Sequence, residues 1–486
     1  MSGIDGLVAG VLGNPAVPGE ALLRALTGEL GRVACNGLAE ATAFPQEVIE
    51  VMVGHPDRRV RMALAGNPHV DPVQRARLVT DPDRVVAVWT VRGGRHPDGD
   101  PRPLPDDAYA RFLSHVMWSE GDPDGDLLTR DEMMQELVAS PDTPSHIYRS
   151  FARRPEAELR LMACWWWESH VMVDRVALTL DPVRGVRRRA RRAAFDVRRC
   201  LTDIDWSPTG RGSEFFISHR PLTRADAERI VLGDAPPHYR PYAAGNSHLP
   251  ADLVAVLARD PDPRIRYRVS IRPELTEGQR AAIDYEVPAL ADLDDPMQLV
   301  PRCLVGTPEE WARSRHPALR RRAACSGGQG RARSDAGALA DELRDALAVD
   351  PDLGVRVLTC RHQVGVAPEL LLRAYRDFHG CHRNRLTYRP GFPTHGLARF
   401  AGDPDPGMRE LVLRDPGASA EVVLGLLADP ERCVRTALAR HPAVPVDRLL
   451  VLLDDPELGP YAARNPALPV EVMHRILDAA GVPRGV

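Results

Sequence analysis

The sequence predicts an all-α protein built from short helices that pair and stack as an α-solenoid. Three observations predict it: the chain has 45 prolines, boundaries of the type x-Pro recur at a regular spacing, and the segments between them carry an apolar stripe. Aromatic residues make up only 5% of the chain, which favours a core of Leu, Val and Ala between closely packed helices.

Proline marks the predicted helix boundaries. It suits the first turn of a helix, where its missing N–H needs no partner, and it pushes the preceding residue out of the helical conformation. In the C-terminal part the boundaries fall at Asp403, Asp415, Asp429, His441, Asp455 and Asn465, in steps of 12, 14, 12, 14 and 10 residues. Consecutive pairs of steps span 24–26 residues, which predicts a repeat of that length holding two helices.

Two kinds of helical segment alternate. Segment 445–453, PVDRLLVLL, opens on a proline, places an acid in its first turn and continues into leucines. Segment 429–442, DPERCVRTALARHP, places Val434, Ala437 and Leu438 at i, i+3 and i+4, which is one apolar stripe. Neither helix can bury its stripe alone, so stacking of neighbouring pairs must supply the core.

Charge and residue usage exclude several classes of function. A net charge of -4 over 486 residues gives no bulk attraction to nucleic acid or to anionic membranes. All 63 residues counted as Lys or Arg are arginine, which excludes the P-loop, the protein kinase active site and Schiff-base or PLP chemistry, because each needs a lysine. The chain also has no G-x-S-x-G or H-E-x-x-H motif, so we expect no enzymatic activity and no cofactor.

The N-terminal segment does not have the pattern of a signal peptide. Residues 1–20 have no basic residue before the apolar stretch, and an Asp and two prolines interrupt that stretch. No window approaches 18 uninterrupted apolar residues, and the eight cysteines are scattered without a disulfide-rich spacing. We therefore expect a soluble, reduced, cytoplasmic protein that does not contact a membrane.

The boundary phrases resemble a known repeat family. DPDPRIRYRVSIRP at 260–273, DPERCVRTALARHP at 429–442 and the N-P-x-[VL]-P phrases at Asn14 and Asn465 are similar to the variant leucine-rich repeat, a bacterial relative in style of HEAT and armadillo repeats. The resemblance is good over 1–95 and 400–480, and fair over 140–280 and 316–375. It implies alternating α- and 3-10 helices wound into a right-handed superhelix without β-strands.

Five segments are predicted along the chain. They are N-terminal helical repeats at 1–95, a loop-rich insertion at 96–130, central helical repeats with an Arg-rich segment at 131–280, an irregular helical and loop segment at 281–345, and C-terminal helical repeats at 346–486. The insertions are rich in Gly, Pro and charge, and in solenoids such insertions often lie on the recognition face.

An arginine recurs six residues after most boundaries. The column comprises Arg61, Arg160, Arg187, Arg266, Arg322, Arg356 and Arg435, with Ala87 as the exception. In four of these seven segments the boundary residue is Asp, which gives the D-x5-R spacing that acts as a stacking device in HEAT repeats. We interpret the column as a structural ladder between repeats, because Arg matches carboxylate and carbonyl acceptors. The other interpretation is a row of guanidinium groups for an acidic partner.

One segment carries far more arginine than the others. Residues 184–199 contain eight arginines, while Val183, Val186, Ala190, Ala193 and Val197 keep an apolar stripe for the core. The candidate binding residues here are Arg184, Arg187, Arg188, Arg191 and Arg192. A solvated cationic surface is one interpretation, and a docking patch for nucleic acid or an acidic protein is the other.

Three consecutive tryptophans, Trp165, Trp166 and Trp167, are added to the candidate binding residues. They span about 300° of a helix, so they cannot all face the core and at least one must be exposed or in an interface. With Glu168 and the nearby arginines they are faintly similar to HEAT-like DNA glycosylases, which hold damaged bases on a concave face.

Two further motifs are candidate metal sites. Cys360, His362, His379, Cys381 and His382 are soft ligands, but their spacings differ from the usual zinc pairs. Segment 119–132, SEGDPDGDLLTRDE, resembles an EF-hand loop, but Leu127 stands at the glycine position and the loop is one residue short. We predict no metal site.

The sequence therefore favours a non-enzymatic scaffold that binds an unidentified protein partner through an extended solenoid surface. A nucleic-acid-binding or DNA-glycosylase-type protein that uses the Arg-rich segment and the tryptophans is the alternative, and a self-assembling array is a third interpretation.

Overall fold

The computed structural model describes residues 3–28, 31–41, 44–94, 102–118, 128–140, 142–196, 204, 206, 217–218, 220–233, 235–287, 307–326, 339–380 and 382–484. Within these residues every regular element is an α-helix or a 3-10 helix, and none is a β-strand. The predicted all-α class is therefore confirmed for this part of the chain. The mutual contacts of the helices define two compact units, unit 1 (Met1–Pro144 and Phe392–Val486) and unit 2 (Ser145–Gly391). The five predicted segments remain a sequence prediction.

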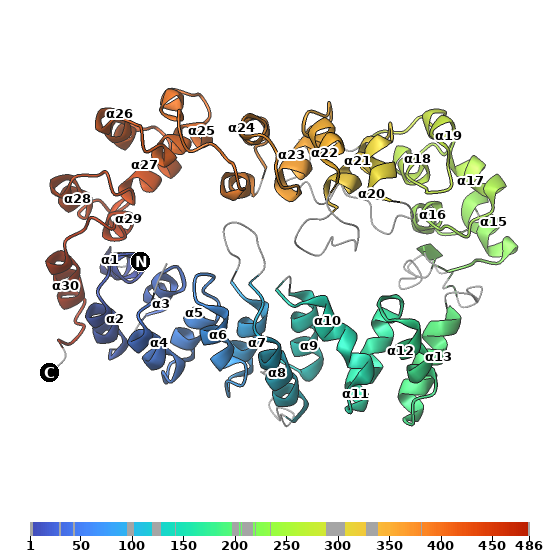
Figure 1. The fold of residues 1–486 in the computed structure, drawn as a ribbon, viewed down its shortest axis with the longest axis horizontal. Helices are drawn as coiled ribbons and strands as arrows, with labels where there is room; N and C mark the ends of the chain where they lie inside the picture. Colours follow the sequence, from blue (N-terminus) through green and yellow to red (C-terminus); the bar gives the residue numbers. More distant parts are fainter. Residues whose placement is uncertain are drawn as a thin grey trace. The chain divides into compact units, whose positions relative to one another are not determined.

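Unit 1 combines the two ends of the chain (Figure 1). Its N-terminal elements are α1 (Gly3–Leu12), α2 (Gly19–Leu26), α3 (Arg32–Ala39), α4 (Gln46–Val53), α5 (Arg58–Ala65), α6 (Pro72–Arg75), η1 (Ala76–Leu78), α7 (Arg84–Arg92), α8 (Asp106–Trp118) and α9 (Arg130–Ala139). Its C-terminal elements are η8 (Ala398–Phe400), α25 (Pro406–Glu410), η9 (Leu411–Arg414), α26 (Ala420–Gly425), η10 (Leu426–Ala428), α27 (Arg432–Ala439), α28 (Val446–Leu452), α29 (Gly459–Ala463) and α30 (Val470–Ala479).

Unit 2 is built in the same style from the middle of the chain. Its elements are α10 (Ser145–Arg149), η2 (Ser150–Arg153), α11 (Ala157–Ala163), η3 (Cys164–Ser169), α12 (Met172–Thr179), α13 (Arg184–Asp196), α15 (Arg224–Leu232), η4 (Pro237–Tyr239), α16 (Arg240–Ala244), α17 (Ala251–Leu257), α18 (Pro263–Ser270), α19 (Glu277–Ala281), α20 (Pro308–Arg313), α21 (Pro317–Ala324), α22 (Asp341–Ala348), α23 (Leu353–His362), α24 (Pro368–Asp377) and η7 (Arg383–Tyr388). Helices two positions apart along the chain pack on each other, for example α11 on α13 and α16 on α18.

The Asp-Pro-Asp phrases start helices through two successive side-chain caps. In the phrase before α18, the carboxylate of Asp260 accepts from the backbone N–H of Asp262 at 2.8 Å, and Asp262 then accepts from the N–H of Arg264 at 2.9 Å. Asp403 and Asp405 do the same before α25. Each acceptor satisfies a backbone donor that the helix itself leaves unpaired, so this phrase fixes where the helix begins.

Prolines stand at the helix boundaries as predicted. In the helices of the PVDRLLVLL type, however, the proline lies one residue before the helix and not in its first turn. Pro445 was expected inside the first turn, whereas α28 begins at Val446 and Pro445 is its N-cap in an extended conformation. Pro18, Pro45 and Pro469 hold the same place before α2, α4 and α30. An extended N-cap suits the fixed φ of proline, and its missing N–H is outside the helical hydrogen bonds.

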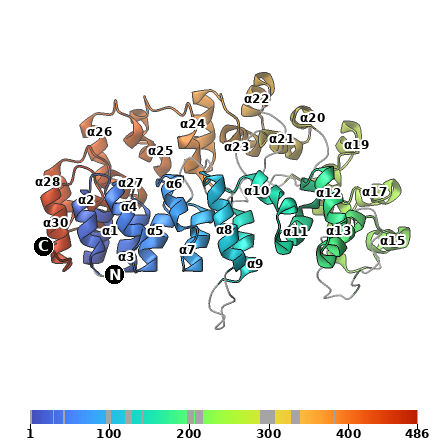
Figure 2. The ribbon, with the colours of Figure 1, turned by 60° about the horizontal axis from the view of Figure 1, so that its bottom comes forward.

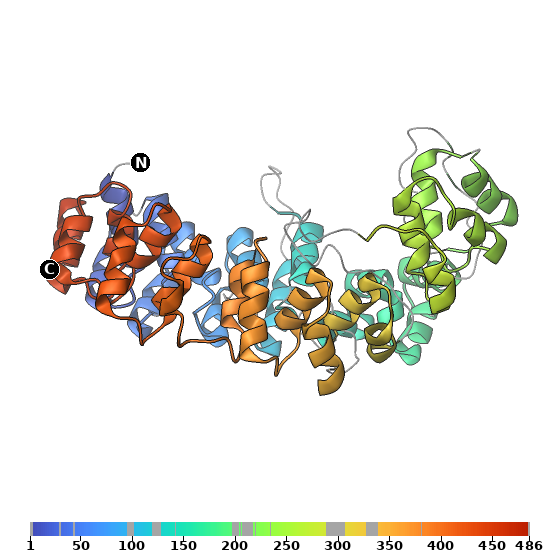
Figure 3. The ribbon, with the colours of Figure 1, turned by 90° about the horizontal axis from the view of Figure 1, so that it is seen from above.

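One hydrophobic core joins the two ends of the chain within unit 1. Val8, Val11 and Leu12 of α1 belong to the same buried cluster as Met473 and Leu477 of α30. Figures 1, 2 and 3 show the red C-terminal helices directly beside the blue N-terminal ones. We call the contact of α1 and α2 with residues 460–484 the terminal junction.

Small residues allow α1 and α29 to approach closely in the terminal junction. Gly6 and Gly10 lie one helical turn apart on α1, and a Cβ at Gly10 would overlap the carbonyl oxygen of Pro460. Arg24 of α2 adds hydrogen bonds to the carbonyl oxygens of Val482 and Pro483, at 2.6 and 2.9 Å, and an ion pair with Asp478.

The asparagine of the recurring N-P-x-[VL]-P phrase fastens this junction. Asn14, which is 1% exposed, donates from its side chain to the carbonyl oxygens of Ala463 and Asn465 at 2.9 and 2.6 Å. Asn465 donates in the same way to Ala439 and His441, 26 and 24 residues earlier. In both cases the acceptors are a boundary residue and the residue two positions before it. The first helix pair therefore contacts the last one as the last one contacts its predecessor.

A related amide contact, with its two acceptors three residues apart, recurs inside both units. Asn67 donates to Leu38 and Ala41 in unit 1, and Asn246 donates to Ile217 and Arg220 in unit 2. Both asparagine side chains are fully buried. A buried amide that loses its acceptors pays a desolvation cost, so these contacts fix the register of one helix pair on the next.

No described helix combines the length and the apolar character that crossing a membrane requires. The longest, α8 and α13, have 13 residues each.

Candidate functional site

The arginines of the column make the same contact with the turn before their own helices. In each case Nη1 donates to the two carbonyl oxygens that lie six and five residues earlier, at the preceding boundary. Arg61, Arg160, Arg187, Arg266, Arg320, Arg356, Arg409 and Arg435 all make this pair of contacts. Each guanidinium therefore occupies the turn that precedes its own helix.

Most of these arginines also reach an acid of the following helix pair. The Nε atom of Arg61 lies 2.7 Å from the carboxylate of Asp81. The same distance is 2.6 Å from Arg160 to Asp181 and 2.7 Å from Arg409 to Asp429. Arg320 pairs with Asp350 in the same way, while Arg356 pairs with Asp377, Arg435 with Glu457 and Arg266 with Asp284. The pairs of Arg61, Arg160, Arg320 and Arg409 are charge-assisted bonds to buried carboxylates, where Arg geometry is most effective, whereas Asp284 is exposed.

One residue of the predicted column is wrong. Arg322 does not make the turn contacts, because Arg320 makes them with Ser314 and Arg315, and Arg322 lies over the ring of Trp311 instead. In the D-x5-R phrase at 260–266 the two side chains have different partners. Arg266 bonds the backbone carbonyl of Asp260, and the carboxylate of Asp260 accepts from Arg240 of the preceding helix pair at 3.3 Å.

The sequence interpretation missed Arg409, although Asp403-Pro404 stands six residues before it in the same pattern. It also missed the asparagine contacts described above. The spacing from Asp403 was the available signal for Arg409, whereas a hydrogen-bonding role for the boundary asparagines had no such signal within a single repeat.

The Arg-rich segment folds as α13 and packs on α11, α12 and η3. Val186 and Ala190 are buried as predicted, but Val183 is 40% exposed, which corrects the predicted stripe; Val197 lies outside the described residues. Arg184, Arg188, Arg191 and Arg192 are exposed, and Arg187 is half-buried. Arg191 donates from Nε to the carbonyl oxygen of Thr179 at 3.1 Å. One face of α13 therefore presents guanidinium groups to solvent.

The two tryptophans whose side chains are described differ in exposure. Trp165 is 69% exposed, and the guanidinium of Arg189 lies 4.3 Å from the centre of its ring. Trp167 is half-buried, and the side chain of Trp166 lies outside the described residues. The expectation that at least one tryptophan is exposed is met by Trp165. A guanidinium over its ring already occupies one face of that indole.

Helix α12 exposes apolar side chains along one face. Met172, Val173 and Leu180 are 69%, 66% and 68% exposed, and Val176 and Val171 are also exposed. Asp174 is buried on the opposite face, where Arg153 donates to it from Nε at 2.7 Å and from Nη2 at 3.1 Å. The inward side of α12 thus holds this acid and the buried Leu178, while the remaining large apolar side chains face solvent, contrary to the usual arrangement.

Comparison with α4 shows how unusual this face is. Counted from the first helical residue, Met172, Val173 and Val176 correspond to Gln46, Glu47 and Glu50 of α4, which are also exposed. The positions that α4 buries with Val48 and Ile49 hold Asp174 and Arg175 in α12. The chain thus places apolar residues at solvent positions where another of its helices has polar ones.

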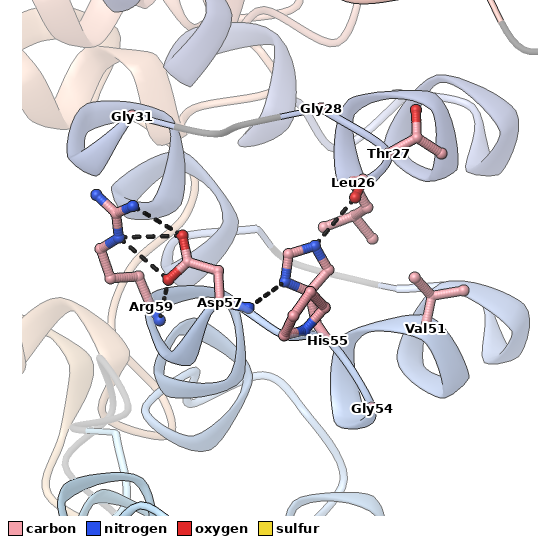
Figure 4. Close-up of a pocket in the computed structure, with 10 residues that line it drawn as sticks. Leu26, Thr27, Gly28, Gly31, Val51, Gly54, His55, Asp57 and Arg59 are labelled. Atoms are coloured by element: carbon pink, nitrogen blue, oxygen red, sulfur yellow. Dashed lines mark hydrogen bonds and ion pairs between the residues drawn. The ribbon is translucent and has the colours of Figure 1, made fainter.

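A pocket of about 900 Å³ lies where α2 and α4 end and where α3 and α5 begin (Figure 4). His55 spans it: Nδ1 accepts from the N–H of Asp57 at 3.1 Å, so Nε2 carries the proton and donates to the carbonyl oxygen of Leu26 at 3.0 Å. The hydrogen bonds from Arg59 hold the pKa of the Asp57 carboxyl below its ordinary value. The polar groups of this pocket are thus engaged with one another and with the turn, and they give no sign of a reacting group.

The candidate metal ligands are not gathered. No group of three or more His, Cys, Asp or Glu side chains is placed to hold a metal among the residues that the structure describes. Cys360 is fully buried, and burial raises the pKa of its thiol to about 12, so it is a poor thiolate ligand. Cys381 and most of the EF-hand-like segment, 119–127, lie outside the described residues.

His316 provides a pH-dependent contact in unit 2. It is 1% exposed, accepts from the N–H of Ala318 at Nδ1 and bonds Ser270 Oγ at 2.8 Å through Nε2, while Tyr285 stacks on its ring. Burial lowers its pKa from 6.5 to about 4.

We expect unit 2 to lose stability as pH falls from about 6.5 to about 4. The unfolded chain binds a proton at His316 in this window and the folded chain does not, so acid favours unfolding; above about pH 6.5 the contribution is complete. His316→Asn keeps an N-cap acceptor and should flatten the dependence of the melting temperature on pH over this range. An unchanged slope in the variant would show that other groups cause it.

Comparison of the chain with protein-family models and with curated proteins found no match.

Proposed function

We propose that this chain is a non-enzymatic helical-repeat scaffold that binds a protein partner through the exposed apolar face of α12. We further propose that its helix pairs form a right-handed α-solenoid of the variant leucine-rich-repeat type. The recurring arginine and asparagine contacts support the repeat architecture, because one contact made at successive helix pairs is what stacking of equivalent units requires.

The reversed polarity of α12 carries the functional proposal. Solvent contacts four large apolar side chains of this helix and its C-cap: Met172, Val173, Val176 and Leu180. Exposed apolar surface is unfavourable in free energy, and a partner that covers it removes this penalty. Charged groups elsewhere in the chain have structural partners: the ladder arginines pair with acids of the next helix pair. A surface that departs from this pattern is the best candidate for recognition.

The double variant Val173→Glu/Val176→Glu tests this proposal. Both side chains are exposed, and α4 carries Glu at the equivalent positions, so we expect an unchanged melting temperature. We also expect the variant to lose the protein that the unaltered chain captures from its native cell, as measured by quantitative mass spectrometry. Val51→Glu on α4, where the residue is 41% exposed, is the matched control and should capture the same partner. Equal capture by all three proteins would contradict a role for α12.

The second candidate function is nucleic-acid binding, and the exposed Arg184 and Arg188 favour it. Neither residue has a hydrogen-bond or ion-pair partner among the residues that the structure describes. Nuclease treatment before capture separates the two functions, because a partner held through nucleic acid is released and a directly bound protein is retained. Sub-micromolar binding to damaged DNA that needs Trp165 and Arg188 would favour the glycosylase-type alternative.

A further inference from the structure

The apolar face of α12 ends directly at a group of arginines. Leu180 is the C-cap of α12, and its neighbours along the chain are acceptors for two guanidinium groups. Arg191 of α13 bonds the carbonyl oxygen of Thr179, and Arg187 bonds those of Asp181 and Pro182. Both guanidinium groups are therefore fixed at the end of the apolar face, within reach of anything that lies along it.

The acids near this end of α12 already have arginine partners. The carboxylate of Asp174 is paired with Arg153, and that of Asp181 is paired with Arg160. Arg187 differs in this respect from Arg61, Arg160 and Arg409, since it has the two turn contacts but no carboxylate partner among the described residues. Arg187 and Arg191 therefore form no ion pair with a carboxylate among the described residues, although the Asp181 carboxylate, which pairs with Arg160, also lies close enough to act on Arg187.

The dimensions of the apolar face fit one helix. Met172, Val176 and Leu180 stand at i, i+4 and i+8, and they extend about 12 Å along α12. A second helix laid along this line meets it with residues at its own i, i+3 or i+4, and i+7 positions. The apolar face of a single helix can also lie in a lipid interface, so vesicle binding is one arm of the test.

We propose that this surface binds an amphipathic helix of an acidic protein segment. Its apolar residues would cover Met172, Val176 and Leu180, and Asp or Glu residues at one end would pair with Arg187 and Arg191. The inference rests on the proposed function and adds the chemistry of the partner to it. Apolar contact supplies the affinity, and the charge at one end fixes the direction in which the partner helix lies.

Selection from a library of random 16-residue peptides displayed on phage, with the full chain as the target, tests this inference. We expect the enriched peptides to be net acidic and to carry apolar residues at the spacing of one helix face. Binding of a selected peptide should fall at least tenfold in Val176→Glu and in Arg191→Glu, and it should weaken with added salt. Val51→Glu is the control and should bind the peptide like the unaltered chain.

Three outcomes would overturn the inference: no enriched peptides, enrichment of basic or uncharged peptides, or peptides that bind Val176→Glu equally well. Binding to phosphatidylserine vesicles that is lost in Val176→Glu, without peptide binding, would assign the surface to a lipid instead. In each of these cases the capture experiment with Val173→Glu/Val176→Glu decides separately whether α12 binds a protein, so failure of the inference is distinguished from failure of the proposed function.

Discussion

Gly10→Ala should destabilise unit 1 by about 2 kcal/mol, because the added methyl group overlaps the carbonyl oxygen of Pro460 in the terminal junction. The atom that it meets belongs to the backbone of α29, so the helices must move apart to accommodate it. Separation of α1 from α29 also weakens the amide contacts of Asn14. Thermal unfolding and hydrogen exchange of the α1, α29 and α30 amides measure the effect.

Gly3→Ala is the matched control on the same helix. A Cβ at Gly3 meets no atom within 4 Å, so this change should be neutral or should stabilise the helix by up to about 1 kcal/mol through helix propensity. Asn14→Ala should act in the same direction as Gly10→Ala, since it leaves two buried carbonyl groups without donors. If Gly10→Ala and Gly3→Ala melt alike, α1 does not depend on α29 in solution.

Arg409→Leu should destabilise unit 1 by about 3 kcal/mol, because it leaves the buried carboxylate of Asp429 without its partner. Arg409 is 10% exposed and its side chain makes four contacts, two with Asp429 and two with the turn at Asp403 and Pro404. Denaturant unfolding should show the loss, and the additional change Asp429→Asn should recover part of it, since a neutral amide costs less to bury.

An exposed ion pair serves as the comparison for this contact. Arg59 pairs with Asp57 but is half exposed, so Arg59→Leu should cost less than about 1 kcal/mol. The hydrogen bonds from Arg409 hold the pKa of Asp429 below its ordinary value, so the stabilisation is present above about pH 4 and is lost as pH falls through the lowered pKa. Equal losses in Arg409→Leu and Arg59→Leu would contradict a structural role for the ladder.

The positions of most helices could be predicted because their signals are local. In the phrase before α18, Asp260 and Asp262 each cap a backbone N–H two residues later, so both the residue types and the spacing are dictated within five residues of chain. The all-α class follows from many such signals and from the apolar stripes between them.

The register error at Arg322 has a physical cause in the two places that proline can occupy. Pro56 precedes the N-cap of α5, whereas Pro317 is the first residue of α21, after its N-cap His316. A lone His-Pro phrase does not distinguish these positions. Counting six residues from His316 selects Arg322, whereas the turn begins at Ser314, six residues before Arg320. Asp-Pro-Asp-Pro, as at 260–263, contains both prolines and is unambiguous.

The face of α12 and the terminal junction could not be predicted in the same way, because both depend on distant parts of the chain. The sequence of α12, MVDRVALT, holds one Asp-Arg pair among mostly apolar residues, and the burial of Asp174 and Leu178 shows which side faces inward. The partners of Asn14 lie 449 and 451 residues away, so its phrase predicted a boundary and gave no sign of what the amide bonds.

The terminal junction also governs the order in which the chain can complete its fold during synthesis. Asn14 leaves the ribosome 451 residues before Asn465, which at about 5–20 residues per second is a delay of roughly 20–90 s. Throughout this interval the side of α1 that carries Gly6 and Gly10 has no α29 to pack on. The first helix pair of a nascent chain therefore keeps this surface uncovered until the last helix pair has been synthesised.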